Sequence, residues 1–188
     1  MNRDINRFVL DREQAVLVVI DVQERLAPAM PEKIYKKLRN NIETLLKAAE
    51  ILGVPVIATE QYPRGLGHTV PELKDACNGS VVEKVSFGCC GEQGFVDELK
   101  KLGRSQVLLT GMEAHVCVYQ TVLGLLESGY HVHLVNDAIC SRSKTDYLAG
   151  VENARAAGAV VTTTEMALFQ MLKVAGTPEF KAVSSLVK

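Results

Sequence analysis

Short apolar runs alternate with longer amphipathic stretches along almost the whole chain. The first run, AVLVVI at 15–20, has no polar position, and further runs follow at 54–59, 81–85, 106–111, 131–136 and 159–164. A run that is apolar on both faces is typical of a strand buried in a parallel sheet. The pattern therefore predicts six strands in this order.

The stretches between these runs repeat their apolar residues with helical spacing. The clearest one opens after Pro31 and continues to Leu52, and Gly53 follows it. Proline near the start and glycine just past the end are common helix boundaries. Further helices are expected at 94–102, 114–128, 145–157 and 166–174, and a short one in the C-terminal PEFKAVSSLVK.

Strands and helices that alternate about six times predict an α/β fold with a mainly parallel, doubly wound sheet and helices on both faces. Crossovers between parallel strands are right-handed, which leaves few topologies. The chain shows no internal repeat and no interdomain linker, and 188 residues suffice for one well-buried core. We therefore expect a single domain over residues 1–188.

The composition argues against several classes of function. The formal net charge is -1, which gives no basic field for nucleic acid or for an anionic membrane. The chain lacks an apolar run near the ~18 residues that span a bilayer. The N-terminus lacks the apolar core of a signal peptide. These features predict a cytoplasmic protein without nucleic-acid or membrane partners.

The cysteines form an odd set without a C-x-x-C pair, and no histidine or second cysteine pair lies at zinc spacing. Reduced thiols in a reducing compartment fit this pattern best. Each thiol must then be judged by its own surroundings: Cys77, Cys89, Cys90, Cys117 and Cys140.

Three ionisable residues fall at or near the ends of predicted strands. Asp21 directly follows the first strand, Lys84 lies in the third, and Cys117 follows the fourth at the start of a helix. In an open parallel sheet, ligands bind beyond the carboxyl ends of the strands. Taken singly, each residue has an ordinary structural interpretation. The aspartate could cap a turn, the lysine could pair with Glu83 at the surface, and the cysteine could be a small buried hydrophobe.

Taken together, the three residues suit nucleophilic catalysis. A thiol reacts as the thiolate, and free cysteine has a pKa near 8.5. A helix N-terminus and a nearby lysine should bias Cys117 toward the thiolate. A carboxylate within hydrogen-bond reach can take the thiol proton and return it to a leaving group. Backbone N–H groups in the loop GMEAHVC could bind the oxyanion.

Three separated segments of the chain resemble the signature blocks of the isochorismatase-like cysteine hydrolases. They are VVIDVQERL, EKVSFGCC and GMEAHVCVYQTVLGLLESGYHVHLVNDAICSR, and the resemblance runs from Ala15 to Leu172. It implies a three-layer α/β/α sandwich on a six-stranded parallel sheet. It also implies that Asp21, Lys84 and Cys117 are the catalytic residues of a hydrolase acting on a small amide or related acyl C–N bond through a thioester.

The same resemblance implies a cis peptide bond between Met112 and Glu113, with the backbone N–H groups of Glu113 and Cys117 as oxyanion donors. Members of this family commonly form homo-oligomers, and the segment 180–187 could supply apolar contacts between subunits.

The branch of the family is indicated by two departures. Nicotinamidase-type members hold zinc through an Asp-x-His pattern, whereas this chain has Glu60 and Gln61 there, and His68 fits a polar loop residue. We therefore predict neither a metal nor another cofactor. True isochorismatases, which cleave a vinyl ether, replace the cysteine by a small residue, so Cys117 argues against that alternative. The amino-acid sequence of the matching segments is most similar to the metal-free branch of isochorismatase domain-containing proteins.

Four further residues are candidates for contact with a small-molecule substrate, although structural roles are about as plausible for some. They are Gln23, Gln61, Tyr62 and Phe87. His115 is a rival base that ranks below Asp21, because residues two apart on a helix do not face each other. Cys89 and Cys90 lie near the expected pocket, where packing is their simplest role.

Two alternatives come from other classes. A nucleotide enzyme is disfavoured, because the turn DVQERLAP lacks G-x-G-x-x-G and no P-loop motif occurs. A catalytically idle scaffold of the same fold stays open, although the three polar residues at strand ends weaken it. The sequence does not identify the substrate.

Overall fold

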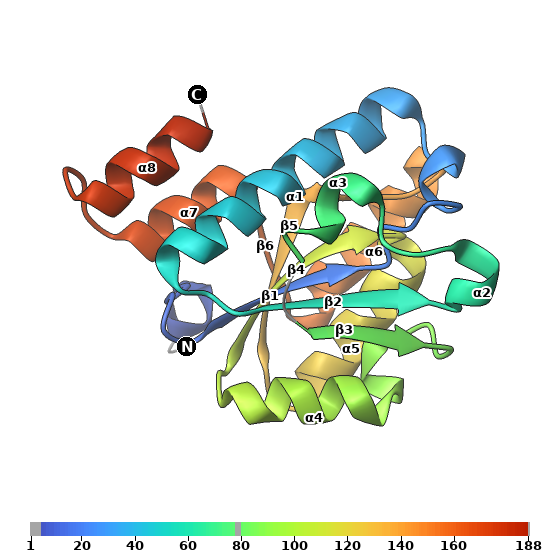
Figure 1. The fold of residues 1–188 in the computed structure, drawn as a ribbon. Coiled ribbons are helices and arrows are strands. Elements are labelled where there is room, and N and C mark those ends of the chain that lie inside the picture. Colours follow the sequence, from blue (N-terminus) through green and yellow to red (C-terminus); the bar gives the residue numbers. More distant parts are fainter. Residues whose placement is uncertain (1–4, 78–79, 188) are drawn as a thin grey trace.

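A computed structural model describes residues 5–77 and 80–187. It contains one sheet with the strand order β3-β2-β1-β4-β5-β6, in which every neighbouring pair is parallel (Figure 1). The predicted α/β fold is thereby confirmed. The strands are β1 (Ala15–Ile20), β2 (Val56–Gln61), β3 (Ser80–Lys84), β4 (Gln106–Met112), β5 (His131–Cys140) and β6 (Val160–Thr162).

Helices cover both faces of this sheet. Side chains of β1 alternate between them, so that Leu17 and Val19 join the core under α1, α7 and α8, while Val18 and Ile20 join the core over α4, α5 and α6. The helices are α1 (Glu32–Leu52), α2 (Pro63–Leu66), α3 (Pro71–Lys74), α4 (Gln93–Leu102), α5 (Tyr119–Glu127), α6 (Lys144–Ala157), α7 (Thr164–Leu172) and α8 (Pro178–Leu186).

The C-terminal helix packs on its own chain. Val183 of α8 is fully buried, and the Phe180 ring meets Phe169 of α7 edge-on with ring centroids 6.1 Å apart. The predicted short helix is confirmed. Its innermost side chains are used within the fold rather than offered to another subunit.

Strand β5 is longer than predicted. The β4–β5 register shifts between Leu109 and Gly111, and the strands then pair again from Gly111 with Ile139. Gly111 has a φ of 114°, and a Cβ there would lie 2.0 Å from the Ile20 carbonyl oxygen, so only glycine fits. Asp137 directly follows the predicted run 131–136, which ends too early. It lies inside β5, and its Oδ1 caps the start of α7 by accepting from the Thr164 amide at 2.8 Å.

The region predicted as one helix at 114–128 is divided. A π-helical turn, η4 (Ala114–Val118), precedes α5, and a 3₁₀ turn, η3 (Cys89–Gly91), lies before α4. Two further 3₁₀ turns are η1 (Ile5–Phe8) and η2 (Ala27–Ala29). Single π-turns inside helices occur frequently at functional sites. Here the π-turn follows β4 and carries Cys117.

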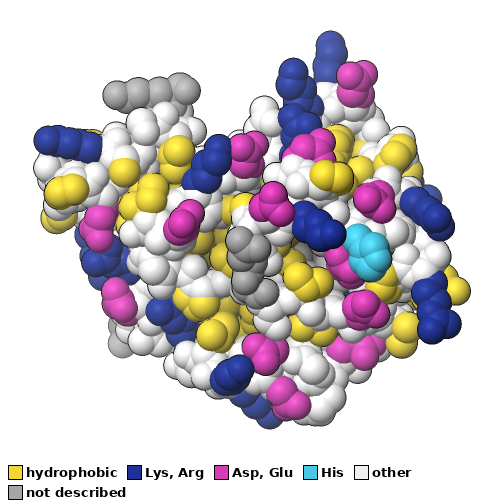
Figure 2. Space-filling model, in the orientation of Figure 1, with side chains coloured by type: hydrophobic (Ala, Val, Ile, Leu, Met, Phe, Trp, Pro, Cys, Tyr) yellow, Lys and Arg dark blue, Asp and Glu magenta, His cyan; other side chains and the backbone are white. Residues whose placement is uncertain are grey.

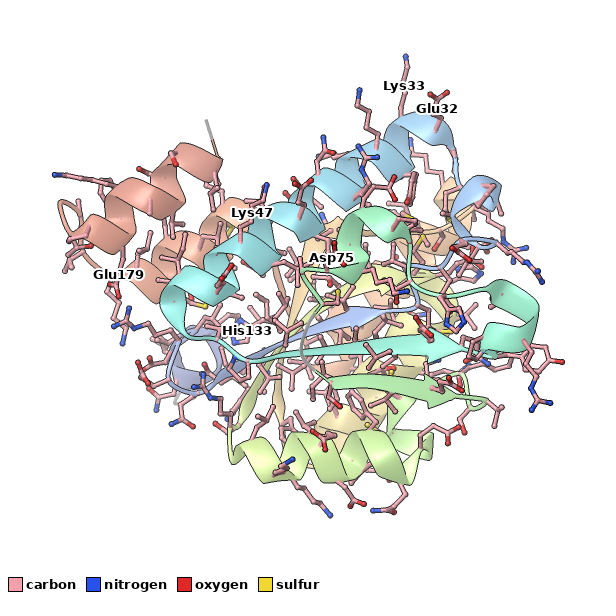
Figure 3. All side chains as sticks on the ribbon, in the orientation of Figure 1. Glu32, Lys33, Lys47, Asp75, His133 and Glu179 are labelled. Carbon is pink, nitrogen blue, oxygen red and sulfur yellow. The ribbon has the colours of Figure 1, made fainter. Side chains whose placement is uncertain are left out.

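Charges of both signs are interspersed on the surface face shown in Figure 2. Side chains of Glu32 and Lys33 project outward from α1, whereas His133 lies inside the fold (Figure 3). In the part of the chain that the structure describes, no helix is long and apolar enough to cross a membrane.

The sheet order places the chain's topological switch beside β1. The chain winds from β1 outward to β2 and β3, and then crosses to β4 on the other side of β1. Loops diverge at such a point and leave a crevice beyond the carboxyl ends. Asp21 follows β1 and the Cys117 turn follows β4, so both lie at this switch point.

Candidate active site

Asp21 is the first residue after β1 and is completely buried. Its φ of 51° lies in the left-handed region, which aspartate tolerates better than most residues. Its amide donates to the Thr59 carbonyl at 3.1 Å, and its Oδ1 accepts from Thr59 Oγ1 at 2.7 Å. Backbone and side chain are therefore both attached to the neighbouring strand β2.

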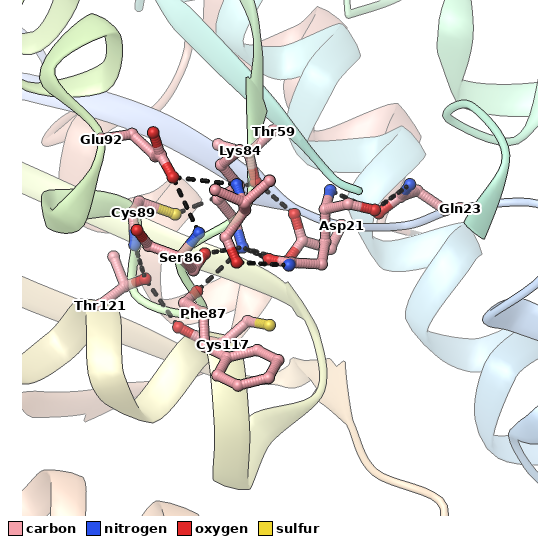
Figure 4. A network of polar contacts seen from close by, with 12 residues as sticks. Asp21, Gln23, Thr59, Lys84, Ser86, Phe87, Cys89, Glu92, Cys117 and Thr121 are labelled. Carbon is pink, nitrogen blue, oxygen red and sulfur yellow. Dashed lines mark hydrogen bonds and ion pairs between the residues drawn. The ribbon is translucent and has the colours of Figure 1, made fainter. Parts of the chain in front are cut away.

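Lys84 is the last residue of the edge strand β3, and its side chain turns inward instead of pairing with Glu83 (Figure 4). Its Nζ lies 2.8 Å from Asp21 Oδ2, and both side chains are fully buried. Burying two charges is costly unless further hydrogen bonds satisfy them. Lys84 has three such partners, which are Gln61 Oε1 at 2.6 Å, the Phe87 carbonyl at 2.9 Å and the Ser86 carbonyl at 3.2 Å.

Cys117 completes the group from the π-turn η4, with 6% of its surface exposed. The pKa of its thiol is raised to about 12, mainly by burial and then by the negative charge of Asp21, while the charge of Lys84 acts to lower it. A side-chain interaction with the Asp21 carboxylate also acts to raise this pKa. The expectation of a bias toward free thiolate is therefore wrong for the resting site.

The raised pKa has a definite chemical consequence. At neutral pH the resting pair is a thiol beside a carboxylate, because losing the proton to water would place two negative charges together. Moving the proton from Cys117 to Asp21 keeps the total charge constant and leaves the thiolate beside Lys84. Internal transfer would therefore supply a thiolate without a change in total charge.

A second thiol borders the same group. Cys89 of η3 is completely buried, its Sγ lies 3.9 Å from Thr59 Oγ1, and its amide donates to Thr121 Oγ1 at 2.9 Å. Burial raises the pKa of Cys89 to about 12 and that of the half-buried Cys90 to about 11. Both thiols are therefore protonated, and the contacts of Cys89 are those of a packed side chain.

The loop that leads to Cys117 is held by Glu113. The Met112–Glu113 peptide bond is cis. The buried Glu113 carboxylate accepts from both the backbone amide and the Nε of Arg142, each at 3.0 Å. Its carbonyl accepts from the amides of Val116 and Val118 in the π-turn. These contacts fix the loop in which the oxyanion donors are predicted, and the donor roles of Glu113 and Cys117 stay predictions.

The predicted substrate contacts divide into two kinds. Gln23 and Gln61 are buried, and their amides already have partners. Gln23 Nε2 donates to the carbonyls of Gln61 and Gly67, and Gln61 Nε2 donates to the Val85 carbonyl. Tyr62 and Phe87 are each 54% exposed, as a pocket wall requires. A cavity of about 360 Å³ lies next to the site and is lined by Tyr62, Pro63, Arg64, Glu83, Lys84, Val85 and Glu92.

The other histidines and acids near the site are engaged elsewhere. His115 Nδ1 lies 3.0 Å from Ser141 Oγ. Glu60 accepts from Thr69 and from His68, and these hydrogen bonds outweigh burial and hold the pKa of Glu60 below its usual range. Within the described residues, no group of three or more His, Cys, Asp or Glu side chains could hold a metal ion. The absence of a metal stays a prediction.

Thr59 is a polar contact of Asp21 that no motif in the sequence indicated. It is 1% exposed and donates to the Asp21 carboxylate. The only signal in the sequence was a threonine near the end of an apolar strand, which by itself is an ordinary strand residue.

The chain is similar to proteins of one family along most of its length. A family model described as the isochorismatase domain matches residues 15–166. Isochorismatase domain-containing protein 2 of Danio rerio is 40% identical over 179 residues, which cover 95% of this chain and 89% of that protein. A secreted isochorismatase effector of Phytophthora sojae (strain P6497) is 40% identical over 184 residues, which cover 93% of this chain and 84% of that protein.

A solved structure shows the same likeness in three dimensions. The structure named MAR1 ribonuclease from Caenorhabditis elegans matches this fold with a TM-score of 0.89 and 40% sequence identity. The match covers 95% of this chain and 92% of that one.

Proposed function

The chain belongs to the isochorismatase family, and from this premise we propose that it is a cysteine-dependent hydrolase of small amides or related acyl C–N compounds. One observation carries the proposal. The completely buried Asp21–Lys84 ion pair, with 2.8 Å between Nζ and Oδ2, lies against the thiol of Cys117. A carboxylate beside a thiol and a fixed cation are the parts that thiol activation needs.

In the first half of the reaction, Asp21 takes the proton of the Cys117 thiol while the sulfur attacks the acyl carbon. The C=O pair of electrons moves to oxygen, and the amides of Glu113 and Cys117 bind the resulting oxyanion. When the oxyanion collapses, the C–N bond breaks. The protonated Asp21 gives its proton to the leaving nitrogen, which departs as an amine and leaves a thioester on Cys117.

In the second half, water hydrolyses the thioester. Asp21, again ionised, takes one proton from the water as its oxygen attacks the acyl carbon. Collapse of this second oxyanion breaks the C–S bond, and Asp21 returns the proton to the sulfur. The acid product leaves, and the thiol, carboxylate and ammonium are restored. Lys84 keeps its proton throughout and stabilises whichever partner is negative.

The ion pair also distinguishes this function from a catalytically idle scaffold. A buried ion pair contributes little net stability compared with apolar side chains of similar volume. A fold that needed only stability at this position would therefore gain nothing from Asp21 and Lys84. The vinyl ether reaction of isochorismatases is disfavoured by Cys117 itself, since that reaction does not require a thiol.

The proposed substrate is a small molecule. Three similar solved structures bear the name ribonuclease, but this chain has a formal net charge of -1, and the face shown in Figure 2 mixes both signs of charge. RNA binding draws mainly on clustered Lys and Arg that neutralise phosphates. The free state of all five cysteines supports a reducing compartment, for which we propose the cytoplasm.

We also propose that the protein assembles as a homo-oligomer, as the family resemblance implies. The innermost side chains of α8 pack within the chain, so this helix could contribute to such a contact only through its outer face. Light scattering at micromolar concentration should show a species larger than one chain of 20.5 kDa. A strict monomer would contradict the proposal.

The proposed activity is tested with a panel of small amides and carbamoyl compounds. Purified wild-type protein should hydrolyse at least one class, and Cys117→Ala should abolish that turnover. Cys117→Ser should be nearly inactive, because a hydroxyl is much harder to deprotonate than a thiol. Adding Asp21→Asn to Cys117→Ala should reduce activity little further, since the residues act as a unit. Equal turnover by wild type and Cys117→Ala would refute the proposal.

A further inference from the structure

Strand β2 lies between the two strands that carry the ion pair. Asp21 follows β1 and Lys84 ends β3, so their side chains meet across β2. Alternation along β2 places Thr59 and Gln61 on one face, while Glu60 points to the other and binds His68. Two neutral polar side chains are therefore positioned where the charged pair crosses the strand, and Figure 4 shows Thr59 beside Asp21.

Thr59 fixes the orientation of the carboxylate. Its hydroxyl donates to Asp21 Oδ1 at 2.7 Å, and its carbonyl holds the Asp21 amide at 3.1 Å. The other oxygen, Oδ2, lies 2.8 Å from Lys84 Nζ, yet it receives no well-directed hydrogen bond from any described residue. Oδ2 therefore keeps a lone pair that can accept a proton.

Gln61 determines where the lysine protons go. The ammonium has three N–H bonds, and three neutral oxygens accept from it, of which Gln61 Oε1 is the nearest at 2.6 Å. Gln61 is itself held, because its amide donates to Gln23 Oε1 at 2.8 Å and its Nε2 donates to the Val85 carbonyl. Four oxygens, with Asp21 Oδ2 among them, thus lie within 3.2 Å of an ammonium that has three protons, so Gln61 Oε1 competes with Oδ2 for one of them.

We propose that Thr59 and Gln61 are positioning residues that keep Asp21 Oδ2 available as the proton acceptor, Thr59 by occupying Oδ1 and Gln61 by drawing the Lys84 protons away from Oδ2. The inference rests on the proposed function of Asp21 as the acceptor of the Cys117 proton. It also assigns Gln61, and Gln23 behind it, to the support of Lys84 rather than to substrate contact.

The two residues should affect Asp21 in opposite directions. Loss of the Thr59 donor makes the carboxylate hold a proton more strongly, which favours the thiolate form of Cys117. Loss of the Gln61 acceptor lets Lys84 donate to Oδ2, which makes the carboxylate hold a proton less strongly and disfavours the thiolate. The titratable groups that face this carboxylate are Lys84, Cys89 and Cys117, and Glu92 acts on Lys84.

The test measures the rate at which iodoacetamide alkylates Cys117, read by mass spectrometry of the digested protein between pH 4.5 and 9. This probe needs no substrate. In the wild type, the rate of Cys117 alkylation should not depend on pH over part of this range. The reason is that the thiolate forms by proton transfer to Asp21, without release of a proton to water. The matched variants are Thr59→Val, Thr59→Ser and Gln61→Met.

Thr59→Val should raise the rate in the pH-independent range about tenfold and move its acid limb upward by about one pH unit, the effect of losing one hydrogen bond to a charged group. Thr59→Ser keeps the hydroxyl and should match wild type within about twofold. Gln61→Met, which has similar length but no strong acceptor, should lower the rate about tenfold. Labelling of Cys89 should stay negligible in every variant, which excludes unfolding as the cause of a faster rate.

Equal rates in all variants, or changes of the same sign in Thr59→Val and Gln61→Met, would overturn the inference. If Thr59→Val does not fold, Thr59→Ala removes the same donor with less crowding. Failure of the positioning role is distinguishable from failure of the proposed function. Unchanged labelling with amide turnover lost in Cys117→Ala would contradict only the positioning role. Opposite labelling shifts without any amide turnover would contradict only the proposed function.

Discussion

Two regions of the sheet bury ionisable side chains but supply them with different partners. At the carboxyl ends of β1 to β3, Asp21 and Lys84 are surrounded by opposite charge and by hydrogen-bonding neighbours. In the middle of β5, His133 is 1% exposed, and its Nε2 has no hydrogen-bond partner among the described residues. Burial, with a smaller effect of His131, lowers the pKa of His133 to about 4.

The contrast shows how this fold handles a polar group that it takes out of water. A group without a partner gives up its charge, because the charged form loses its hydration. A charge is kept only where the fold supplies an opposite charge and several hydrogen bonds, as for Lys84. The presence of this costly arrangement at the carboxyl ends supports the proposal that the chemistry takes place there.

The largest loss of stability is expected from removing the lysine of the Asp21–Lys84 ion pair. Lys84→Met should lower the free energy of unfolding by about 3–5 kcal/mol, because it leaves the buried Asp21 carboxylate without its cation. Urea denaturation at pH 7 measures the loss. The matched double variant, Asp21→Asn with Lys84→Met, removes the stranded charge and should recover part of it. A double variant that is less stable than the single one would show that the charge pair is not what Lys84 contributes.

The second prediction concerns how the buried His133 makes the free energy of unfolding depend on pH. Between about pH 6.5 and 4 the unfolded chain binds a proton at His133 and the folded chain does not, so folding becomes less favourable as the pH falls. His133→Leu should remove this acid penalty, which amounts to about 3 kcal/mol at pH 4. Denaturation of both proteins from pH 7 to 4 gives the difference. Parallel stability curves would mean that the imidazole is protonated inside the fold.

The smallest change in stability is expected at the exposed His68, which contrasts with the buried His133. The hydrogen bond and charge of Glu60 raise the pKa of His68, the opposite direction from His133. The pair therefore stabilises the fold below the unfolded pKa near 6.5, and this contribution disappears as the pH rises through the higher folded value. His68→Asn should be slightly less stable than wild type at pH 5.5 and equal at pH 9. A constant difference at both values would exclude the ion pair as its cause.

The sequence predicted the sheet well, because runs such as 15–20 are apolar on both faces and leave few alternatives to a buried parallel strand. The sequence also predicted that Asp21, Lys84 and Cys117 lie together at the carboxyl ends of the strands, since parallel strands end on the same side of the sheet. Thr59 was missed because its contact depends on the β1–β2 register, in which Ile20 pairs with Thr59.

Two further points were beyond the sequence for physical reasons. The direction of the Cys117 pKa shift depends on how deeply the π-turn buries the thiol, which hydropathy does not report. The direction of the Gln23 side chain depends on a tertiary contact with the end of β2, and loop side chains carry no periodic signal. Burial depth and loop orientation are properties of the assembled fold.

The most direct test of the central claim is to quench the wild-type protein with acid during turnover of an amide found in the panel. Trypsin separates the peptide 105–142, which contains Cys117, from 85–100, which contains Cys89 and Cys90. We predict one acyl mass on Cys117, located by fragmentation and absent from Cys117→Ala. An acyl group on Cys89 or Cys90, with Cys117→Ala still turning over the amide, would contradict the account.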